Sequence, residues 1–522
     1  MNPPSHSRRW TGWEMAVLAA VPMGLILAGV VFRAMAGVFE ADPDYVYLLN
    51  GLDILTLYPP GYYDHPGTTL EVIAAFVTWA TWLFSPHLHN APDIKTAVLL
   101  HPEYFLRAIN LVLIAANAVA AFYMSLRIRM AAGLGAALVA QLSILISFSV
   151  MIGLNRVTPE PLLLAASLVL AGYLAPLVLQ PERFVETGAY AMGLGMLLGF
   201  ILATKITALP LLAAILFLRT RKLRWAAVKA GAAAGLILTL PIAVHYPQMA
   251  KWFARLFIHT GAYGGGPKGV VSPSELWPSF VVLLGQAPEI FVMFGLYAIS
   301  LPLWRGGFRR VMVICAVILA VSILMVLKHP GARYFMPIVG IIALANAAIV
   351  SQSLAEGGAA RIGGILLMLV LAVGIGRNLL ATSTWARNAR ENQSINQKLI
   401  AATIATGCRP IFFYGVNTPL YNLGFGEEYT VHHFSAELNR LYPDALFYDV
   451  FGHRFESFSG PLSMKDARIR LAAGRCFRLV GSPVERFNND FGFGLPREEI
   501  SLVARTPYGL GDSVAVYAWQ PR

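Results

Sequence analysis

Two acids near the beginning of the chain, Asp42 and Asp44, precede apolar residues that recur at helical spacing from Tyr45 onward. This pattern predicts an amphipathic helix that lies on a membrane surface. Asp42 followed by Pro43 fits the N-cap residue and the first residue of a helix. A structural role and a catalytic role are therefore equally supported for Asp42. Asp44 lies in the first turn and is not needed as a cap. For Asp44 we therefore favour a functional role over a purely structural one.

A third acid, Glu160, begins a later helix, with Thr158 as the cap and Pro159 as the first helical residue. Compensation of the helix dipole alone would explain an acid at this position. Glu160 is nevertheless expected on the same membrane face as Asp44, so both acids can face one cavity. Two acids placed in this way suit a site in which one acts as a general base and the other as an orienting partner or a metal ligand.

Cationic residues are expected at the same membrane face. Arg107 opens an apolar run, Lys205 separates two short apolar runs, and Lys328, His329 and Arg333 follow one another closely. Such a concentration of positive charge suggests an anionic ligand, for example a lipid phosphate. The alternative for each residue is ordinary contact with lipid headgroups while its aliphatic stem is buried.

The elements that would position these residues follow from the composition. Of 522 residues, 57% are hydrophobic and 13% are charged, and the mean hydropathy is +0.61. A soluble domain has about 45–50% apolar and about 25% charged residues. The chain is therefore a polytopic membrane protein, and its three cysteines are too few for a disulfide-stapled secreted fold. Topology explains most of the net charge of +12, so a nucleic-acid partner is excluded.

About eleven apolar runs are expected to span the membrane. The dense basic clusters all fall inside when the N-terminus is inside and the C-terminus outside, as the positive-inside rule requires. These clusters are Arg127/Arg129, Arg219/Arg221/Lys222/Arg224, Arg305/Arg309/Arg310 and Arg361. The segment 66–84 would reverse this order, so we expect it to lie in the outer interface as a helix that begins with the capping-box pattern Thr68-x-x-Glu71. The expected spans are 17–32, 105–126, 131–153, 161–179, 189–203, 206–218, 225–244, 279–303, 311–327, 337–354 and 362–381.

The last part of the chain is polar and has short β-like runs, with an amphipathic stretch near 391–406. We expect a transmembrane catalytic domain over 1–381 and a small extracytoplasmic α/β domain over 382–522. Cys408 and Cys476 lie in a compartment that permits disulfides, and both a bridge and two free thiols stay open. The expected strands are 411–414, 477–480, 500–504 and 513–519.

The order of these motifs over about residues 10–380 resembles the GT-C superfamily of polytopic glycosyltransferases. Within it, the chain is similar to the branch that holds the protein O-mannosyltransferases and the lipid A aminoarabinose transferase. Gly67 and Ile206 depart from that pattern, because they stand where relatives have Pro and Gly. The matching residues are Asp42, Asp44 and Tyr45 in the first outer loop, His65, Arg107, Arg156 and Glu160, Lys205, and finally Arg333 and Tyr334.

The resemblance implies an all-α membrane domain with juxtamembrane helices. It also implies an inverting transfer of one sugar from a polyprenyl-phosphate carrier to a lipid, glycan or protein hydroxyl outside the cytoplasm. Asp44 would accept the hydroxyl proton, and Glu160 would position its surroundings or the acceptor. Fixed cations would stabilise the phosphate leaving group. The cation candidates are His65, Arg107, Lys205, Lys328 and Arg333.

Several matters stay open at this point. Relatives differ in metal dependence, so a divalent cation is neither required nor excluded, and no metal ligand is assigned. High Ala and Gly content and short loops point to a bacterial inner membrane, with the site facing the periplasm. The sugar, the acceptor, the oligomeric state and the role of the C-terminal domain are not determined by the sequence.

A transporter or lipid flippase is the main alternative function. That class needs ionisable groups near the bilayer midplane or broken helices, whereas the expected spans are nearly free of charge. Glu289, which follows Pro288 inside the expected span 279–303, is the exception. A non-catalytic sensor or scaffold, with the C-terminal domain as its working part, is a second alternative. No nucleotide, dinucleotide or zinc-protease motif occurs in a usable context, so a soluble cofactor enzyme is unsupported.

Overall fold

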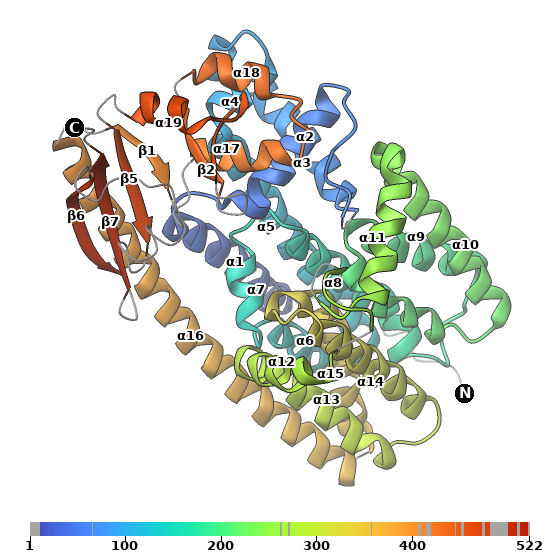
Figure 1. Cartoon of the computed structure of the whole chain (residues 1–522). Helices are drawn as coiled ribbons and strands as arrows, with labels where there is room; N and C mark the ends of the chain where they lie inside the picture. The colour runs from blue at the N-terminus through green and yellow to red at the C-terminus, as the bar shows by residue number, and fades with distance from the viewer. Residues whose placement is uncertain are drawn as a thin grey trace. The chain divides into compact units, whose positions relative to one another are not determined.

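In the computed structural model the chain divides into two compact units. Figure 1 shows the helices and strands with their labels. The helical unit comprises Met1–Val31, Tyr63–Thr69 and Leu111–Thr382, and the mixed unit comprises Phe32–Tyr62, Leu70–Asn110 and Ser383–Arg522. The structure describes residues 11–64, 66–261, 264–269, 272–356, 358–405, 409–413, 419–443, 445–449, 454–471, 475–480, 500–508 and 512–519.

Long apolar helices make up most of the helical unit. Four helices, α1, α3, α5 and α16, begin in one unit and end in the other. The helices with residues in the helical unit are α1 (Gly12–Ala36), α3 (Thr68–Leu83), α5 (Pro102–Ala132), α6 (Leu134–Ile144), α7 (Phe148–Gly153), α8 (Pro159–Leu179), α9 (Gly188–Thr204), η3 (Ile206–Phe217), α10 (Arg221–Leu238), η4 (Leu240–His245), α11 (Tyr246–Ile258), α12 (Pro273–Gln286), α13 (Pro288–Ser300), η6 (Leu301–Leu303), α14 (Gly306–Leu327), η7 (Ala332–Ile338), α15 (Val339–Glu356) and α16 (Gly358–Ala405).

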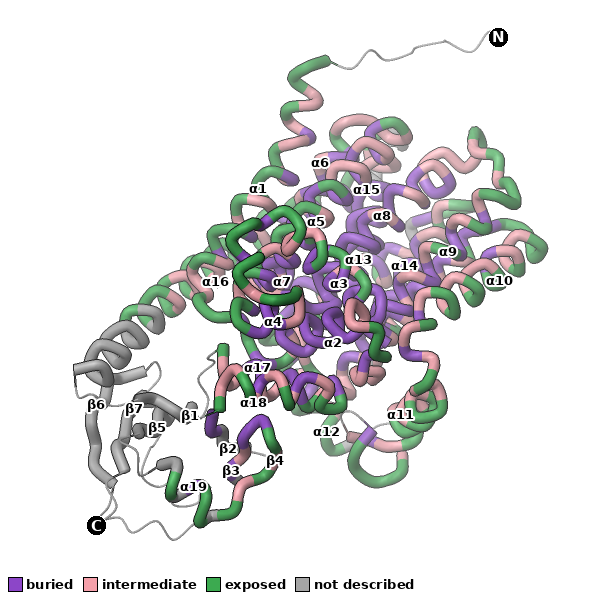
Figure 2. The backbone as a smooth tube through the Cα atoms, turned by 90° about the horizontal axis from the view of Figure 1, so that it is seen from above, coloured by how far each residue is buried: buried purple, intermediate pink, exposed green. Residues whose placement is uncertain are grey.

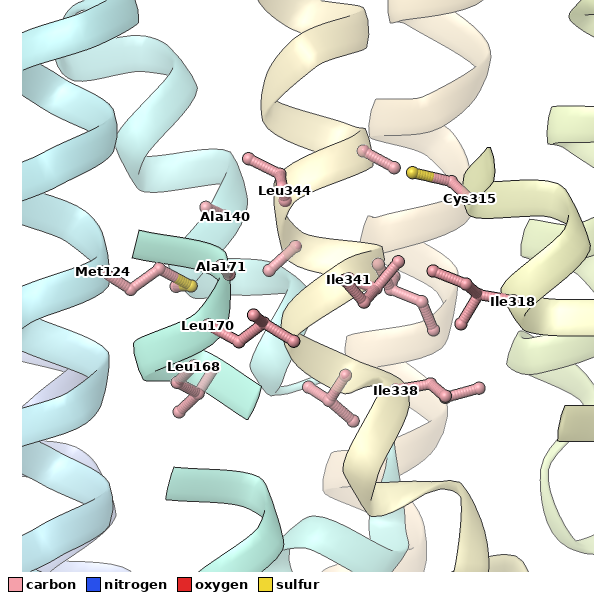
Figure 3. Packing of buried hydrophobic residues seen from close by; sticks show 14 of the residues in the cluster. Met124, Ala140, Leu168, Leu170, Ala171, Cys315, Ile318, Ile338, Ile341 and Leu344 are labelled. Carbon is pink, nitrogen blue, oxygen red and sulfur yellow. The ribbon is translucent and has the colours of Figure 1, made fainter. Parts of the chain in front are cut away.

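The core of the helical unit surrounds α8 and α15, which are drawn mostly as buried in Figure 2. Figure 3 shows apolar side chains of α5, α6, α8, α14, α15 and η7 meeting there. At Gly340 a side chain would meet the backbone of Ser167, so glycine lets α15 approach α8 closely. The outward faces carry many exposed large apolar residues, which suits contact with lipid. The chain is an integral membrane protein.

Among the described residues, six helices are long and apolar enough to cross a membrane, and two bent pairs bring the number to at most eight. The expected spans 131–153, 189–203 and 206–218 appear instead as shorter apolar helices. The expected span 279–303 is broken into α12 and α13, which bend by 99° at Ala287. Pro288 cannot donate a backbone hydrogen bond and starts a new helix there. The expected span 225–244 falls in the second bent pair, where α10 bends by 81° from the helix over 240–258.

The amphipathic stretch 391–406 does not form a separate helix. α16 runs without interruption over 48 residues, from the expected last span into this stretch. Neither Pro nor Gly occurs between Arg377 and Ala405, so nothing in the local sequence ends the helix. The last of the boundaries between the two units along the chain falls within this helix, after Thr382.

The mixed unit combines short helices with two sheets. One sheet has the strand order β1-β5-β7-β6 and contains the expected strand runs, the first of them as far as Phe413; the other has the order β2-β3-β4. Cys408 lies outside the described residues, and so do both expected alternatives for it, a bridge to Cys476 and a free thiol. The elements are η1 (Ala41–Tyr45), α2 (Val46–Leu55), η2 (Pro86–Asn90), α4 (Ile94–Leu100), β1 (Arg409–Phe413), α17 (Pro419–Glu428), α18 (Ser435–Leu441), β2 (Phe447–Asp449), β3 (Arg454–Ser457), β4 (Gly460–Pro461), α19 (Met464–Leu471), β5 (Arg475–Val480), β6 (Ile500–Tyr508) and β7 (Asp512–Trp519).

Helix α2 is buried on all sides, so the expectation of an amphipathic surface helix is wrong. Every residue from Val46 to Asp53 is buried. A side chain at Gly51 would collide with α3, and one at Gly426 of α17 would press on Leu49. Helices α3 and α17 therefore pack on α2 from two sides. They cover the face of α2 that the sequence periodicity assigned to solvent.

Two expected helix caps are also absent. Asp42 has an extended backbone within the turn η1 and does not cap α2, which begins at Val46. Helix α3 begins at Thr68 as expected, but no capping box forms. The Thr68 hydroxyl donates to the Pro66 carbonyl, and neither carboxylate oxygen of the fully buried Glu71 finds a hydrogen-bond partner in the described part of the chain.

A buried polar pair joins the C-terminal helices to α2 within the mixed unit. His433 Nδ1 lies 2.8 Å from Asp53 Oδ1, and the His433 ring stacks on Tyr58. Burial, reinforced by the nearby Glu427 carboxylate, raises the pKa of Asp53 to about 9. The Asp53 carboxyl therefore keeps its proton at neutral pH and is hydrogen-bonded to the His433 ring.

Close packing of α9 on α10 gives a first prediction. A side chain at Gly195 would fall on the Ala227 carbonyl oxygen, whereas one at Gly235, on the facing helix, would come no nearer than 3.8 Å to any atom. Gly195→Ala should therefore lower the free energy of unfolding by about 1–3 kcal/mol. Gly235→Ala is the matched control and should not destabilise the protein. Thermal unfolding in detergent measures both, and equal melting temperatures would contradict the close contact.

Protonated Asp53 gives a second prediction, about pH. The unfolded state releases the Asp53 proton near its ordinary pKa of about 3.9, while the folded state holds it to about pH 9. Stability is therefore lost as the pH rises from about 4 to about 9. Asp53→Asn removes this titration and keeps the size of the side chain. The melting temperature of the wild type should fall relative to that of Asp53→Asn between pH 5 and pH 9, and parallel curves would refute a raised pKa.

Candidate functional site

A buried ion pair between Glu160 and Lys205 forms the centre of the candidate site in the helical unit. The nitrogen of Lys205 lies 2.8 Å from Glu160 Oε1, and both side chains are less than a tenth exposed. Helix α8 starts at Pro159, as expected, and Thr158 occupies the N-cap position without a side-chain cap hydrogen bond. The Thr158 hydroxyl bonds the Glu160 carboxylate instead. Lys205 occupies the turn between α9 and η3, also as expected.

Two further predicted residues, Arg333 and Tyr334, join this pair from η7. The Lys205 ammonium lies 5.0 Å from the centre of the Tyr334 ring, and the Arg333 guanidinium lies 5.1 Å from it. An Arg333 nitrogen donates to the Tyr334 hydroxyl at 3.2 Å. Arg333 also interacts electrostatically with Glu160. One acid, two cations and one aromatic ring are thus brought together from three parts of the sequence.

The loop before η7 supplies two more basic groups. His329 lies beside Tyr334, with 5.3 Å between the ring centres. Burial, together with the charges of Arg333 and Lys205, lowers the pKa of His329. Burial also lowers the pKa of Lys328, whose ammonium donates to the Leu256 carbonyl. Lys328 is therefore bound to α11, and His329 is the group of the loop that contacts the cluster.

The short segment Tyr63–Thr69 also belongs to the helical unit. The Thr69 hydroxyl donates to that of Thr204 at 2.7 Å, directly before Lys205. Tyr63 stacks on His245, with ring centres 5.0 Å apart. Burial raises the pKa of Asp64, which favours the neutral acid. His65, a predicted cation in this segment, lies outside the described residues.

An apolar cavity of about 520 Å³ is lined by residues of α9, η3 and α10. Glycines of α9 and α10 line it, together with Pro66 from the short segment and Phe253 from α11. Ala203 and Ile206, which flank the Lys205 turn, contribute to the same wall. The cavity therefore reaches the turn that carries the candidate site, and its lining suits a hydrocarbon chain.

The other predicted acids lie in the mixed unit. Asp44 is fully buried, and its Oδ2 accepts the Glu40 N–H at 2.9 Å. Tyr45 is also fully buried, and its hydroxyl donates to Glu103 Oε1 at 2.8 Å. The predicted Arg107 is exposed one turn further along α5 and interacts electrostatically with Glu103. Tyr45 and Arg107 thus both interact with Glu103, a hydrogen-bonded acid that the sequence patterns did not reveal.

Arg156, expected in the second outer loop, is half-buried in the turn between α7 and α8. Sequence reasoning missed Glu103 and Asp53, because each is an acid in a helix whose hydrogen-bond partner lies far away in the chain. It also missed Glu427, which accepts from Thr430, Phe434 and Ser435 in the turns that follow it. The best available signal is the rarity of acids among apolar residues. Within the described residues, no three His, Cys, Asp or Glu side chains are placed to hold a metal ion.

Glu289, the acid that favoured a transporter, is buried in the first turn of α13. Arg377 of α16 donates to its Oε2 at 2.9 Å and also to the Gly285 carbonyl. This ion pair connects the α12–α13 bend to α16. An acid held in this way has a structural role that needs no transported ion.

Comparison with known proteins gives a likeness of structure only. No protein-family model and no curated protein matches the chain. The crystal structure of ArnT from Cupriavidus metallidurans bound to undecaprenyl phosphate matches with a TM-score of 0.54 and 12% identity, over 97% of this chain and 98% of that one. The same protein in the apo state matches over the same shares, with a TM-score of 0.51 and 12% identity. The predicted resemblance to the GT-C branch of the lipid A aminoarabinose transferase is confirmed at the level of the fold: the chain has the fold of ArnT.

Proposed function

We propose that the protein transfers a sugar from a polyprenyl-phosphate carrier to an acceptor hydroxyl, with inversion. The observation that carries this proposal is the Glu160–Lys205 pair with Arg333 and Tyr334, beside an apolar cavity. A lipid phosphate needs fixed cations for its head and an apolar groove for its chain, and the helical unit supplies both. The ArnT fold, crystallised with undecaprenyl phosphate, supports the same class of donor.

In the proposed reaction the acceptor oxygen attacks the anomeric carbon of the sugar. The bond from that carbon to the phosphate oxygen breaks, and the polyprenyl phosphate leaves with the electron pair. Its growing negative charge is stabilised by Lys205 and Arg333. Because these cations are already held by Glu160 and the Tyr334 ring, they need not reorganise as the charge develops.

Asp44 is the proposed acceptor of the hydroxyl proton. The Glu40 N–H fixes the orientation of its carboxylate, and the buried Tyr45 and Glu103 support the same turn. Glu160 is proposed as a positioning residue rather than as a base, because its carboxylate is already engaged by Lys205. The proposal assigns no divalent cation to the reaction. The assay therefore varies whether a divalent cation is present.

Asp44→Asn should abolish turnover, because an amide cannot accept the proton, while binding of the donor persists. The purified protein is incubated with polyprenyl-phosphate monosaccharides, with and without EDTA, and mass spectrometry follows donor loss. Asp93→Asn is the matched control, since Asp93 caps α4 in the same unit and Asn caps equally well. Donor consumption that survives in Asp44→Asn would remove Asp44 from the reaction.

Variants of the buried pair separate catalysis from folding. Lys205→Met leaves Glu160 buried without its partner and should cost about 3–5 kcal/mol of stability as well as activity. Adding Glu160→Gln removes the uncompensated charge and should restore most of the melting temperature. The double variant should still fail to turn over the donor. A double variant with normal turnover would show that the Lys205 cation is not needed for the leaving group.

A transporter of lipid-linked sugars is the second candidate, and the specific observation in its favour is the bent pair α12–α13 with its buried acid. The two functions differ in their products. Donor that reaches the opposite leaflet of a proteoliposome unchanged would favour transport. Release of polyprenyl phosphate that depends on Asp44 would favour the transferase.

A further inference from the structure

A second cavity, of about 490 Å³, lies in the helical unit at the helix ends opposite to the Glu160–Lys205 pair. It is bordered by the last residues of α8, η3 and α15 and by the first residues of α14. Glu160 and Lys205 lie at the other ends of α8 and η3. The 21 residues of α8 span about 30 Å, the thickness of a bilayer core. The cavity and the candidate site therefore face opposite sides of the membrane.

The charges that line this cavity are mostly positive. Arg219, Arg305 and Arg310 contribute to its wall, and Glu182 is the acid among the lining residues. Arg219 is also paired with Glu186 at 3.3 Å. All three arginines come from the basic clusters that the positive-inside rule places at the inner face.

The arginines differ in how far they are already engaged. Arg219 donates to the Pro181 carbonyl, and Arg310 donates to the carbonyls of Leu216 and Leu218. These bonds hold both guanidinium groups at the rim. In the part of the chain that the structure describes, Arg305 makes no hydrogen bond or ion pair through its side chain. It stands at the start of α14, where the helix dipole also favours an anion.

The inner wall of the cavity is apolar. Phe308, Val311 and Ile314 of α14 line it on successive turns, and Phe217 faces them from the end of η3. A small soluble anion would gain nothing from this apolar wall. A molecule with a phosphate and an attached hydrocarbon chain would contact both parts of the lining. Gly307 leaves open space at the junction between the arginines and the apolar wall.

We propose that this cavity binds an anionic phospholipid of the inner leaflet. Its phosphate would lie against Arg305 and Arg310, and its first acyl carbons would pack along Phe308, Val311 and Ile314. The bound lipid would hold the ends of α8, η3 and α14 together on the side opposite to the candidate site. This assignment does not depend on the reaction that the protein catalyses.

Binding of phosphatidylglycerol to the purified full-length protein tests the proposal. Native mass spectrometry in a neutral detergent compares phosphatidylglycerol with phosphatidylcholine, and the anionic lipid should bind more tightly. Arg305→Gln should weaken its binding about fivefold, the contribution of one arginine near a lipid phosphate. Gly307→Leu should weaken it further by filling the junction. Arg309→Gln is the matched control, since it removes the same charge from the same turn but does not line the cavity.

Melting temperatures without lipid should be the same for Arg305→Gln and Arg309→Gln, which shows that both variants fold. Equal binding of the two lipids, or equal weakening by both variants, would overturn the proposal. Inorganic phosphate provides the remaining comparison. If inorganic phosphate binds the wild type as tightly as phosphatidylglycerol does, and Arg305→Gln weakens both equally, the cavity takes a free anion and the lipid assignment is wrong.

Discussion

The ion pair between Glu160 and Lys205 is the interaction on which the helical unit depends. Each side chain is buried, and a buried charge without its partner costs several kcal/mol. The start of α8 must therefore stay beside the turn between α9 and η3 in any folded state. Arg333 and Tyr334 can then approach from η7, because the pair already supplies an acid for the guanidinium and a cation for the ring.

The two units place buried acids in different chemical states. In the helical unit Glu160 is held by a cation, and in the mixed unit Asp53 keeps a proton and bonds a histidine. Both arrangements avoid an isolated carboxylate in an apolar interior. The first leaves positive charge available for an anionic ligand, which suits a lipid phosphate. The second joins distant segments without net charge, which suits a structural role.

The helices around α8 and α15 have different surroundings at their two ends. One end carries the Glu160–Lys205 cluster and the nearby apolar cavity lined by α9, η3 and α10, and the other carries the arginine-lined cavity. Both ends combine cations with apolar walls, the pairing that a lipid with a phosphate head requires. A fold shared with ArnT at 12% identity does not transfer a reaction, so the functional argument rests on these side chains.

The sequence by itself determined the features that depend on neighbouring residues. Apolar runs and few charges identified a membrane protein, Pro159 and Thr68 marked helix starts, and the four β-like runs became strands of one sheet. The candidate residues Glu160, Lys205, Arg333 and Tyr334 were found from charge among apolar neighbours and from a family resemblance. Their grouping on one side of the membrane was expected, but no contact between them was.

Only the tertiary structure decided which of these groups meet. Glu160 and Lys205 are 45 residues apart, and Asp53 and His433 are 380 apart, so no local pattern links them. The burial of α2 likewise depends on α3 and α17 and reverses a solvent face that periodicity assigned. Helical starts and strand runs are short-range properties of the backbone, whereas pairing and burial depend on segments that approach only when the chain folds.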